Sequence, residues 1–233
     1  MKRRTLDIVF AVGGAIFAVL LLVLGLVLKN QADFAKSYVH DQLSAQKINF
    51  QPAKTLPAEM QTVTCLVNFG TTNGDPMKGQ PMDSGKKAEC YANEYIGAHM
   101  RAAATGAGYD GATYATMGQY TMKGDGSATS KSLVDQLAAA KTAGDQTKID
   151  AAQKALDTAT GLRGTLLTGE TLRGLLLTSY GFSVFGDRAA LAATICFIAF
   201  GLLLLLSIAG FVHAFVSKSS KDLILVAEHE HKA

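Results

Sequence analysis

Two long apolar segments restrict what this chain can fold into more than any other feature of its sequence. Residues 8–28 contain no charged side chain, and as a helix rising about 1.5 Å per residue they would cross a hydrocarbon core of about 30 Å. Residues 189–216 form a second apolar segment, long enough to span a bilayer with some tilt. We therefore predict a mainly α-helical protein with two transmembrane helices that flank a mostly helical extracytoplasmic domain.

A cleavable signal peptide is the alternative interpretation of the first segment. The apolar part of a signal peptide usually has about 7 to 15 residues and precedes a cleavage site with small residues. Residues 8–28 are longer than this, and no clear site of that kind follows them. We therefore expect the first segment to be retained as a membrane anchor.

Basic residues beside the two segments predict the orientation in the membrane. They are Lys2, Arg3 and Arg4 before the first segment, and Lys218 and Lys221 after the second. Because basic residues near the ends of spans are retained on the cytoplasmic side, residues 1–7 and 217–233 are predicted to be cytoplasmic tails. Residues 29–188 are long enough to be translocated regardless of their charge, and we expect them outside the plasma membrane.

The three cysteines agree with this placement. Cys65 and Cys90 lie between the two spans, and Cys196 lies within the second span. An oxidising compartment would allow a disulfide between Cys65 and Cys90, which in the loop-entropy model stabilises the fold by about 3 to 4 kcal/mol. The alternative is a pair of reduced, buried thiols.

The region between the spans begins with a segment of helical periodicity. Residues 31–50 place Phe34, Tyr38 and Leu43 at roughly helical spacing with polar residues between them. This pattern predicts that the first spanning helix continues beyond the membrane as an amphipathic helix. We expect that helix to end near Pro52.

The remainder of this region divides into two parts of different composition. Residues 53–130 are rich in proline and glycine, which predicts a loop-rich middle with one helix at about residues 86–104. Residues 132–178 are rich in alanine and leucine, with a break at Gly144 and Asp145. The break between two helical stretches predicts a helical hairpin.

Residues 162–178 read LRGTLLTGETLRGLLLT, in which one phrase occurs twice, ten residues apart. Arg163 and Arg173 lie beside leucine clusters that are too short to span a membrane. Their long side chains can lie on apolar surface while the guanidinium reaches phosphate or water, which predicts a helix at the membrane interface. Ten residues place the two arginines about 80° apart around a helix, so we do not expect them to share a face.

Four glycines interrupt this stretch: Gly161, Gly164, Gly169 and Gly174. Each costs a helix about 1 kcal/mol compared with alanine. They therefore predict either close helix packing or a break at residues 168–170.

Two motifs resemble a known family. The phrase GETLRGLLLTSYGFSVFG, residues 169–186, resembles a pattern in small two-span actinobacterial membrane proteins labelled aromatic ring-opening dioxygenase-like. The phrase YVHDQLSAQKINFQP, residues 38–52, is similar to that family's extended helix, which ends in Gln, an aliphatic residue, Phe and Pro. This chain departs from the pattern because Gln51 separates Phe50 from Pro52.

Some proteins similar to this family are accessory subunits of the actinobacterial cytochrome bc–aa3 respiratory supercomplex. The resemblance therefore implies a non-catalytic accessory or assembly role, with integral membrane subunits and the lipid bilayer as partners. The candidate contacts with the membrane interface or with a partner are Arg163, Arg173, Tyr180 and Phe182.

The chemistry of a dioxygenase can be tested against the residues present. A non-haem iron site needs a cluster such as two histidines and a carboxylate. Between the spans the chain offers only His40 and His99, well separated in sequence, and Glu94 is on a different helical face from His99. We expect His40 to be exposed and His99 to be partly buried.

The other histidines lie in or after the second span. His213 could ligate haem, but a lone histidine there more often forms a hydrogen bond or lies at the interface. His229, Glu230 and His231 could hold a metal, but a charged C-terminal tail is usually solvated. We therefore predict no catalytic residue, no metal, no cofactor and no nucleic-acid partner.

Neither apolar segment places an ionisable group at mid-depth, so a channel or transporter is not expected. Gly14 with Ala18 and Ala189 with Ala193 have the spacing that allows close helix packing. Three hypotheses remain: an accessory subunit, a free-standing extracytoplasmic binding or sensory protein, and an enzyme whose site the sequence does not reveal. We favour the first.

Overall fold

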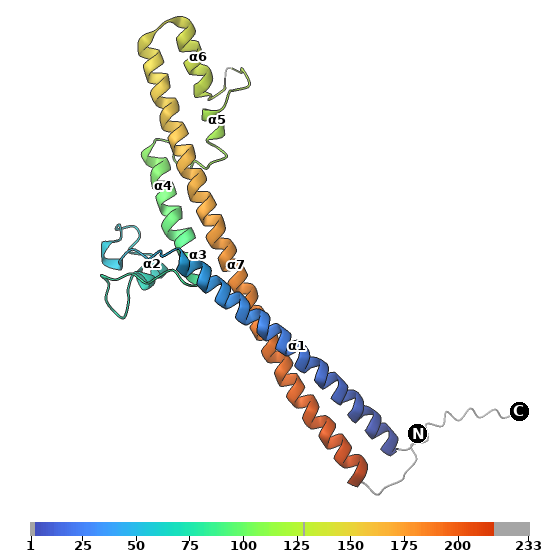
Figure 1. Ribbon diagram of the computed structural model, residues 1–233. Helices are drawn as coiled ribbons and strands as arrows, with labels where there is room; N and C mark the ends of the chain where they lie inside the picture. The colour runs from blue at the N-terminus through green and yellow to red at the C-terminus, as the bar shows by residue number, and fades with distance from the viewer. Residues whose placement is uncertain (1–2, 128, 217–233) are drawn as a thin grey trace, which may run out of the picture. The chain divides into compact units, whose positions relative to one another are not determined.

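The computed structural model describes residues 3–127 and 129–216, which are mainly helical (Figure 1). In these ranges the only β-structure is two isolated bridges, and no strand is formed. This confirms the predicted mainly α class. In chain order the elements are α1 (Arg3–Ala45), η1 (Ala53–Thr55), α2 (Thr64–Phe69), α3 (Gly85–Cys90), the π-helical η2 (Tyr91–Ile96), α4 (Gly97–Gly106), α5 (Gly118–Thr121), α6 (Leu133–Ala143) and α7 (Gln146–Val216).

The chain forms two compact units. Among the described residues, we call 3–37 and 184–216 the anchor unit, and 38–127 and 129–183 the central unit. Lys218, Lys221, His229, Glu230 and His231, and with them the predicted cytoplasmic tail, lie outside the described residues, as do Met1 and Lys2.

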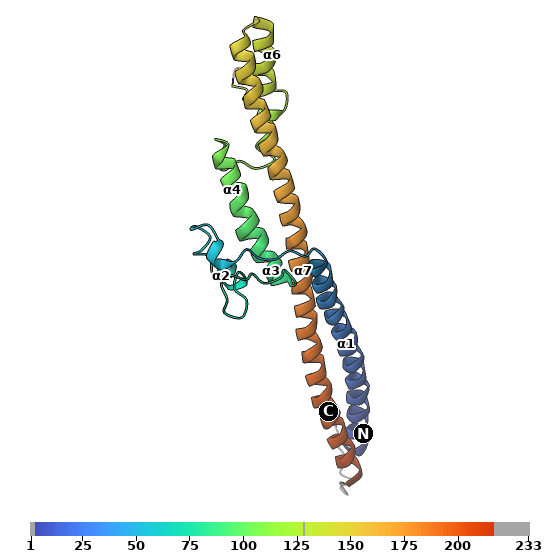
Figure 2. The same ribbon diagram turned by 60° about the vertical axis from the view of Figure 1, so that its left-hand side comes forward.

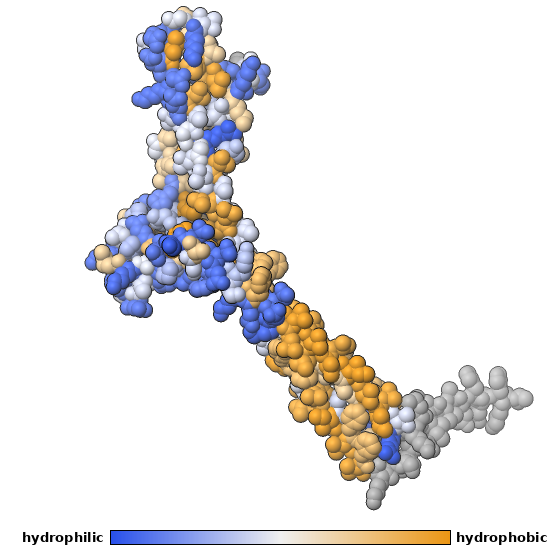
Figure 3. Space-filling view, in the orientation of Figure 1, coloured by the Kyte–Doolittle hydropathy of each residue, from blue (hydrophilic) through white to orange (hydrophobic). Residues whose placement is uncertain are grey.

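Two helices of the described residues, Arg4–Ala45 and Gln146–Val216, are long and apolar enough to cross a membrane. In the most apolar stretch of each helix, only 17% and 6%, respectively, is buried. A core helix of a soluble protein would be mostly buried instead. Figure 3 shows hydrophobic residues, in orange, over most of the visible surface of the anchor unit, as expected for helices surrounded by lipid or by other apolar helices.

Small residues line the contact between the two helices of the anchor unit. On α1 they recur every seven residues, and on α7 at multiples of seven. The buried members are Ala11, Ala18, Gly25 and Ala32 on α1, and Gly186, Ala193, Ser207 and Ala214 on α7. A seven-residue repeat is the signature of helices that pack along one continuous seam.

Individual contacts show that α1 and α7 are antiparallel in this unit. Close neighbours are Gly14 with Ser207, Gly25 with Phe197, and Gly186 with Ala35. At each of these glycines a Cβ atom would come within 3.0 Å of the neighbouring side chain, so a larger residue there would have to displace that neighbour. The predicted packing role is confirmed for Gly14, Ala18 and Ala193, whereas Ala189 is only half-buried.

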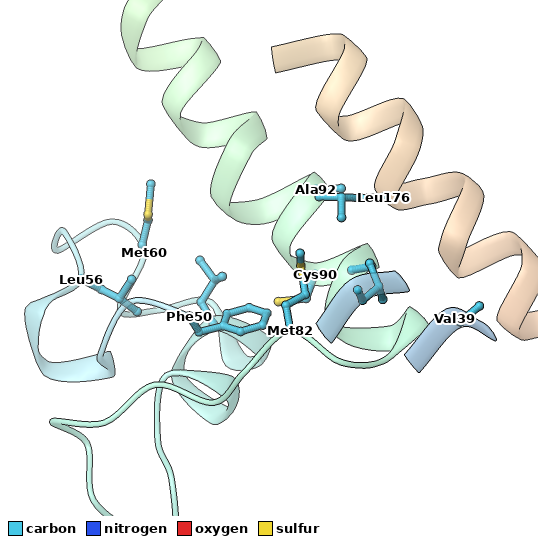
Figure 4. Packing of buried hydrophobic residues seen from close by; sticks show 11 residues of the cluster. Val39, Phe50, Leu56, Met60, Met82, Cys90, Ala92 and Leu176 are labelled. Atoms are coloured by element: carbon cyan, nitrogen blue, oxygen red, sulfur yellow. The ribbon is translucent and has the colours of Figure 1, made fainter. Parts of the chain in front are cut away.

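In the central unit, α3, η2 and α4 follow one another without interruption from Gly85 to Gly106, which confirms the helix predicted at residues 86–104. A cluster of buried apolar residues forms around this helix (Figure 4). It includes Val39, Phe50, Leu56, Met60, Met82, Cys90, Ala92 and Leu176. The loop-rich segment is therefore held by side chains from α1, α7 and its own helix.

The predicted hairpin is also present. Gly144 ends α6 with a left-handed φ of 69°, which glycine adopts without steric cost, and α7 begins at Gln146. Asp145 accepts a hydrogen bond from the Lys148 backbone N–H at 3.2 Å and so caps the start of α7. Figures 1 and 2 both show α6 beside the first turns of α7.

The expected end of the first helix was wrong. Helix α1 ends at Ala45 and not near Pro52, because Lys47 has a left-handed φ of 54° and the chain then becomes extended. There the Phe50 N–H donates to the Gln80 carbonyl at 2.9 Å. Of the two explanations offered for the glycines of residues 161–174, a break at residues 168–170 does not apply, since α7 is continuous through residues 162–178.

The three apolar residues that indicated an amphipathic helix in the outer part of α1 are not equally buried. Leu43 is buried, whereas Phe34 and Tyr38 are both about half exposed. The buried residue one position after Tyr38 is Val39, at the helical offset of four from Leu43. The buried face of this part of α1 therefore includes Val39 and Leu43.

Candidate functional site

The central unit contains an apolar groove of about 580 Å³. Four segments form it: the end of α1, Ile48, the π-helical η2, and the part of α7 between Leu172 and Phe182. Its main apolar residues are Tyr38, Leu43, Leu172, Leu175, Leu176 and Phe182, with Tyr91 and Ile96 from η2. The sequence analysis did not anticipate this groove, which requires segments more than 120 residues apart to meet.

The groove wall contains no Asp, Glu, Lys or Arg side chain. Four hydroxyl groups belong to wall residues: those of Tyr38, Tyr91, Thr178 and Ser179. Thr178 donates to the Gly174 carbonyl at 2.8 Å and Ser179 donates to the Leu175 carbonyl at 3.2 Å. The remaining side-chain amides belong to Gln42 and Gln46. The groove therefore suits an uncharged, apolar occupant.

Several large apolar side chains of the groove face solvent in the described structure. Their exposed fractions are 62% for Leu175, 48% for Tyr38, 47% for Leu172 and 39% for Phe182. The rings of Tyr38 and Phe182 meet edge to face at 5.8 Å. A patch of apolar residues gathered in this way is typical of an interaction site rather than of scattered surface residues.

Arg173 holds α7 against the π-helical turn beside the groove. Its Nε donates a hydrogen bond to the Ala92 carbonyl at 3.1 Å, and its Nη2 donates to Asn93 Oδ1 at 3.4 Å. The Gly97 N–H also donates to the Ala92 carbonyl, which is the wider bonding of a π-helix. Arg173 also forms an ion pair with Glu170 at 3.2 Å.

Arg163 is also directed into the central unit. Its guanidinium lies over the ring of Tyr114, 4.6 Å from the ring centroid. Its Nε is buried and has no hydrogen-bond partner among the described residues. Both arginines thus make contacts within their own chain, and their contact with a membrane interface or a partner stays a prediction.

The other two candidate contacts lie further along α7. Phe182 forms part of the groove wall. Tyr180 is half-buried, and its backbone runs close to Gly85, where a Cβ would lie 3.2 Å from the Tyr180 Cα. The structure therefore brings Arg173 and Phe182 near the groove.

Only one of the four glycines in residues 161–174 allows a close approach. A Cβ at Gly169 would lie 2.5 Å from the Met100 sulfur, so α7 and α4 pack closely there. Gly161, Gly164 and Gly174 have open space beside them. Close packing, the first of the two explanations offered for these glycines, applies at Gly169.

A disulfide joins Cys65 in α2 to Cys90 at the end of α3, the pairing that the sequence allowed. Next to it, Tyr91 stacks on Tyr95 at 4.7 Å and meets Phe50 edge to face at 5.3 Å. Burial, and secondly the neighbouring Tyr95, raise the pKa of the Tyr91 hydroxyl. The disulfide and the aromatic stack therefore hold η2 in place, and Cys196 is buried and unpaired.

The two histidines between the spans make separate contacts. His40 is exposed, as expected, and its Nδ1 lies 3.1 Å from the Asp83 carbonyl. His99 was expected to be partly buried but is exposed, with its ring 4.5 Å from that of Tyr95. Within residues 3–127 and 129–216, no group of three His, Cys, Asp or Glu side chains could hold a metal ion.

His213 has a partner that the sequence analysis missed. Its Nδ1 lies 3.1 Å from Asp7 Oδ2 within the anchor unit. The available signal was that Asp7 directly precedes the first apolar segment and His213 lies near the end of the second. An antiparallel pair of spans brings such positions together.

Comparison of the chain with protein families, curated proteins and solved structures finds no match. The resemblance to the two-span actinobacterial proteins therefore rests on its two motifs. Those motifs, residues 38–52 and 169–186, contain most of the groove wall, since they supply all of its residues from α1 and α7.

Proposed function

We propose that this chain is a non-catalytic accessory or assembly subunit of an integral membrane complex, with the central unit outside the plasma membrane. The observation that carries the proposal is the groove of the central unit, whose exposed apolar residues form an interaction surface. The anchor unit supports it, because its helices use one narrow seam of small residues for each other. Their other apolar faces are left to lipid or to neighbouring subunits.

The actinobacterial cytochrome bc–aa3 supercomplex is the partner that the resemblance implies. Its support is the coincidence of the two motifs with the groove. If the family uses this surface, the motif residues are those that shape it, and Arg173 positions the turn behind it.

A pull-down in mild detergent tests this proposal. The tagged protein is expected to co-purify with subunits containing haem b, c and a in a fixed ratio, detected by absorption spectra and mass spectrometry. A bait that arrives alone and colourless contradicts the subunit role. Stoichiometric iron on the isolated protein contradicts the non-catalytic role.

A matched pair of variants assigns the contact to the groove. Leu175→Glu places a charge in the groove, whereas Leu167→Glu places one on an exposed part of α7 outside it. The first is expected to reduce recovery of the complex and the second to leave it unchanged. Equal recovery with both variants would move the contact to the anchor unit.

A free-standing binding protein is the second candidate function, and the concave form of the groove favours it. Pockets of about 300 to 1,000 Å³ with mostly apolar walls are typical small-molecule sites. This candidate predicts a stable monomer or homodimer that retains a small apolar molecule and no partner subunit.

A further inference from the structure

We propose that the groove of the central unit binds one acyl chain of a membrane phospholipid. This inference rests on the membrane anchoring in the proposed function and is independent of which complex the protein joins. Three observations support it: the chemistry of the groove wall, the length of the groove, and the helices that form the groove.

The wall offers contacts that suit a hydrocarbon chain. The side chains are aliphatic or aromatic apart from Gln42, Gln46, Thr178 and Ser179, and the last two donate their hydroxyls to carbonyls of their own helix. The other two hydroxyls are the phenolic groups of Tyr38 and Tyr91. An extended peptide would need partners for its backbone N–H and C=O groups, and this wall provides few. An alkyl chain needs none, and it would remove the exposed surfaces of Leu172 and Leu175 from water.

The length of the groove matches one leaflet of a bilayer. On α7 the wall extends from Leu172 to Phe182, and ten steps of helix correspond to about 15 Å. One leaflet contributes half of a hydrocarbon core of about 30 Å, so the acyl chain of an ordinary phospholipid has this length. The volume of about 580 Å³ is also within the range of ligand sites.

The helices of the wall also carry the apolar spans. In the sequence, Tyr38 follows the end of the first apolar segment by ten residues, and Phe182 precedes the second by seven. Around helices that are inserted in a membrane, the acyl chains of phospholipids are the most concentrated apolar chains. We therefore commit to a phospholipid chain rather than to an isoprenoid lipid or a partner's side chains.

Tryptophan fluorescence provides a test, because the chain contains no tryptophan. Three single-tryptophan variants of the full chain are reconstituted in phosphatidylcholine vesicles, with and without bromine on the acyl chains. Phe182→Trp reports on the groove, Leu20→Trp on the lipid-facing side of a span, and Met77→Trp on an exposed loop of the central unit. Bromine is expected to quench the first two and not the third.

The controls separate failure of this inference from failure of the proposed function. If Leu20→Trp is not quenched, the anchor is not inserted and the proposed function fails. If Leu20→Trp is quenched and Phe182→Trp is not, the protein is anchored but the groove holds no phospholipid. Quenching of Phe182→Trp by an isoprenoid quinone alone would assign the site to a different lipid and overturn the proposal.

A second pair of variants separates binding from mere proximity to the bilayer. In the Phe182→Trp protein, Leu175→Glu is expected to weaken lipid binding about tenfold, because a carboxylate buried beside the chain is unpaired. Leu167→Glu, on the same helix outside the groove, is expected to have no effect. Full quenching with both variants would show proximity only and would overturn the proposal.

Discussion

Arg173 connects two parts of the chain that are 81 positions apart through its hydrogen bond to the Ala92 carbonyl. That carbonyl already accepts the Gly97 N–H, so the guanidinium supplies a second donor where the π-helical turn widens. Hydrogen bonds from charged groups contribute more than those from neutral ones. At the residue scale, Arg173 therefore has a structural role within the leucine-rich residues 162–178: it binds α7 to a backbone carbonyl of the neighbouring helix.

Replacement of Arg173 by Met is expected to lower the free energy of unfolding of the central unit by about 2 kcal/mol, since a charge-assisted hydrogen bond and an ion pair are lost. Circular dichroism during urea denaturation in detergent measures the change. Arg101→Met is the control, because Arg101 is an exposed residue of α4. An equal loss with both variants would mean that the contact with Ala92 contributes nothing specific.

Because Asp145 caps the start of α7 with a carboxylate, the free energy of unfolding is predicted to depend on pH. Hydrogen bonds from Lys148, first from its side chain and then from its backbone, lower the pKa of the Asp145 carboxyl below its usual value. A carboxyl with a depressed pKa in the folded state contributes stability above its unfolded pKa of about 4, and this is lost as the pH falls through the folded value. Asp145 therefore stabilises the start of α7 at neutral pH.

Asp145→Asn is accordingly expected to be less stable than the unmodified protein at pH 7, and the difference is expected to shrink below about pH 4. Urea denaturation at a series of pH values measures it. Asp150→Asn, on the exposed face of the next turn, controls for loss of a charge. A difference that does not change with pH would show that the cap acts without its charge.

At the scale of elements, the antiparallel seam between α1 and α7 is the clearest case of a regular pattern in the sequence. Its small residues recur at intervals of seven on α1, which keeps one face of each helix toward the other. The sequence analysis identified Gly14, Ala18 and Ala193 but not the seven-residue repeat. Searching the spans for that interval would have found the rest.

Ala18→Leu is expected to destabilise the pairing of the two spans by about 1 to 3 kcal/mol, because added methyl groups in a close contact cause overpacking. Val19→Leu, on the exposed face one position later, is expected to have little effect. Thermal unfolding in detergent compares the two. Equal melting temperatures for the two variants would mean that the seam does not hold the spans together.

The elements of the central unit could be predicted to different degrees. The helix at residues 85–106 and the hairpin at Gly144 follow from local signals, namely helical periodicity and a glycine with an acidic cap. The early end of α1 could not be predicted. It depends on the pairing of Phe50 with Gln80, a contact between segments that the local sequence does not specify.

At the scale of the whole molecule, the two apolar helices and the basic residues beside them in the sequence predict a topology with both termini in the cytoplasm. Alkaline phosphatase inserted in the loop at Gly126 is expected to be active, and the same enzyme fused to the C-terminus is expected to be inactive. Green fluorescent protein at the C-terminus should fluoresce. A C-terminal phosphatase that is active, with a dark fluorescent fusion, would show the opposite orientation.

The sequence by itself determined the features that depend on composition or on neighbours in the chain. These are the apolar helices of membrane-spanning length, the mainly helical class, the hairpin break, and the single cysteine pair available between the spans. Only the tertiary structure decided the groove, the contact of Arg173 with Ala92 and the pairing of Asp7 with His213. The physical reason is that each depends on which helix faces meet, and that is set by packing between residues far apart in the chain.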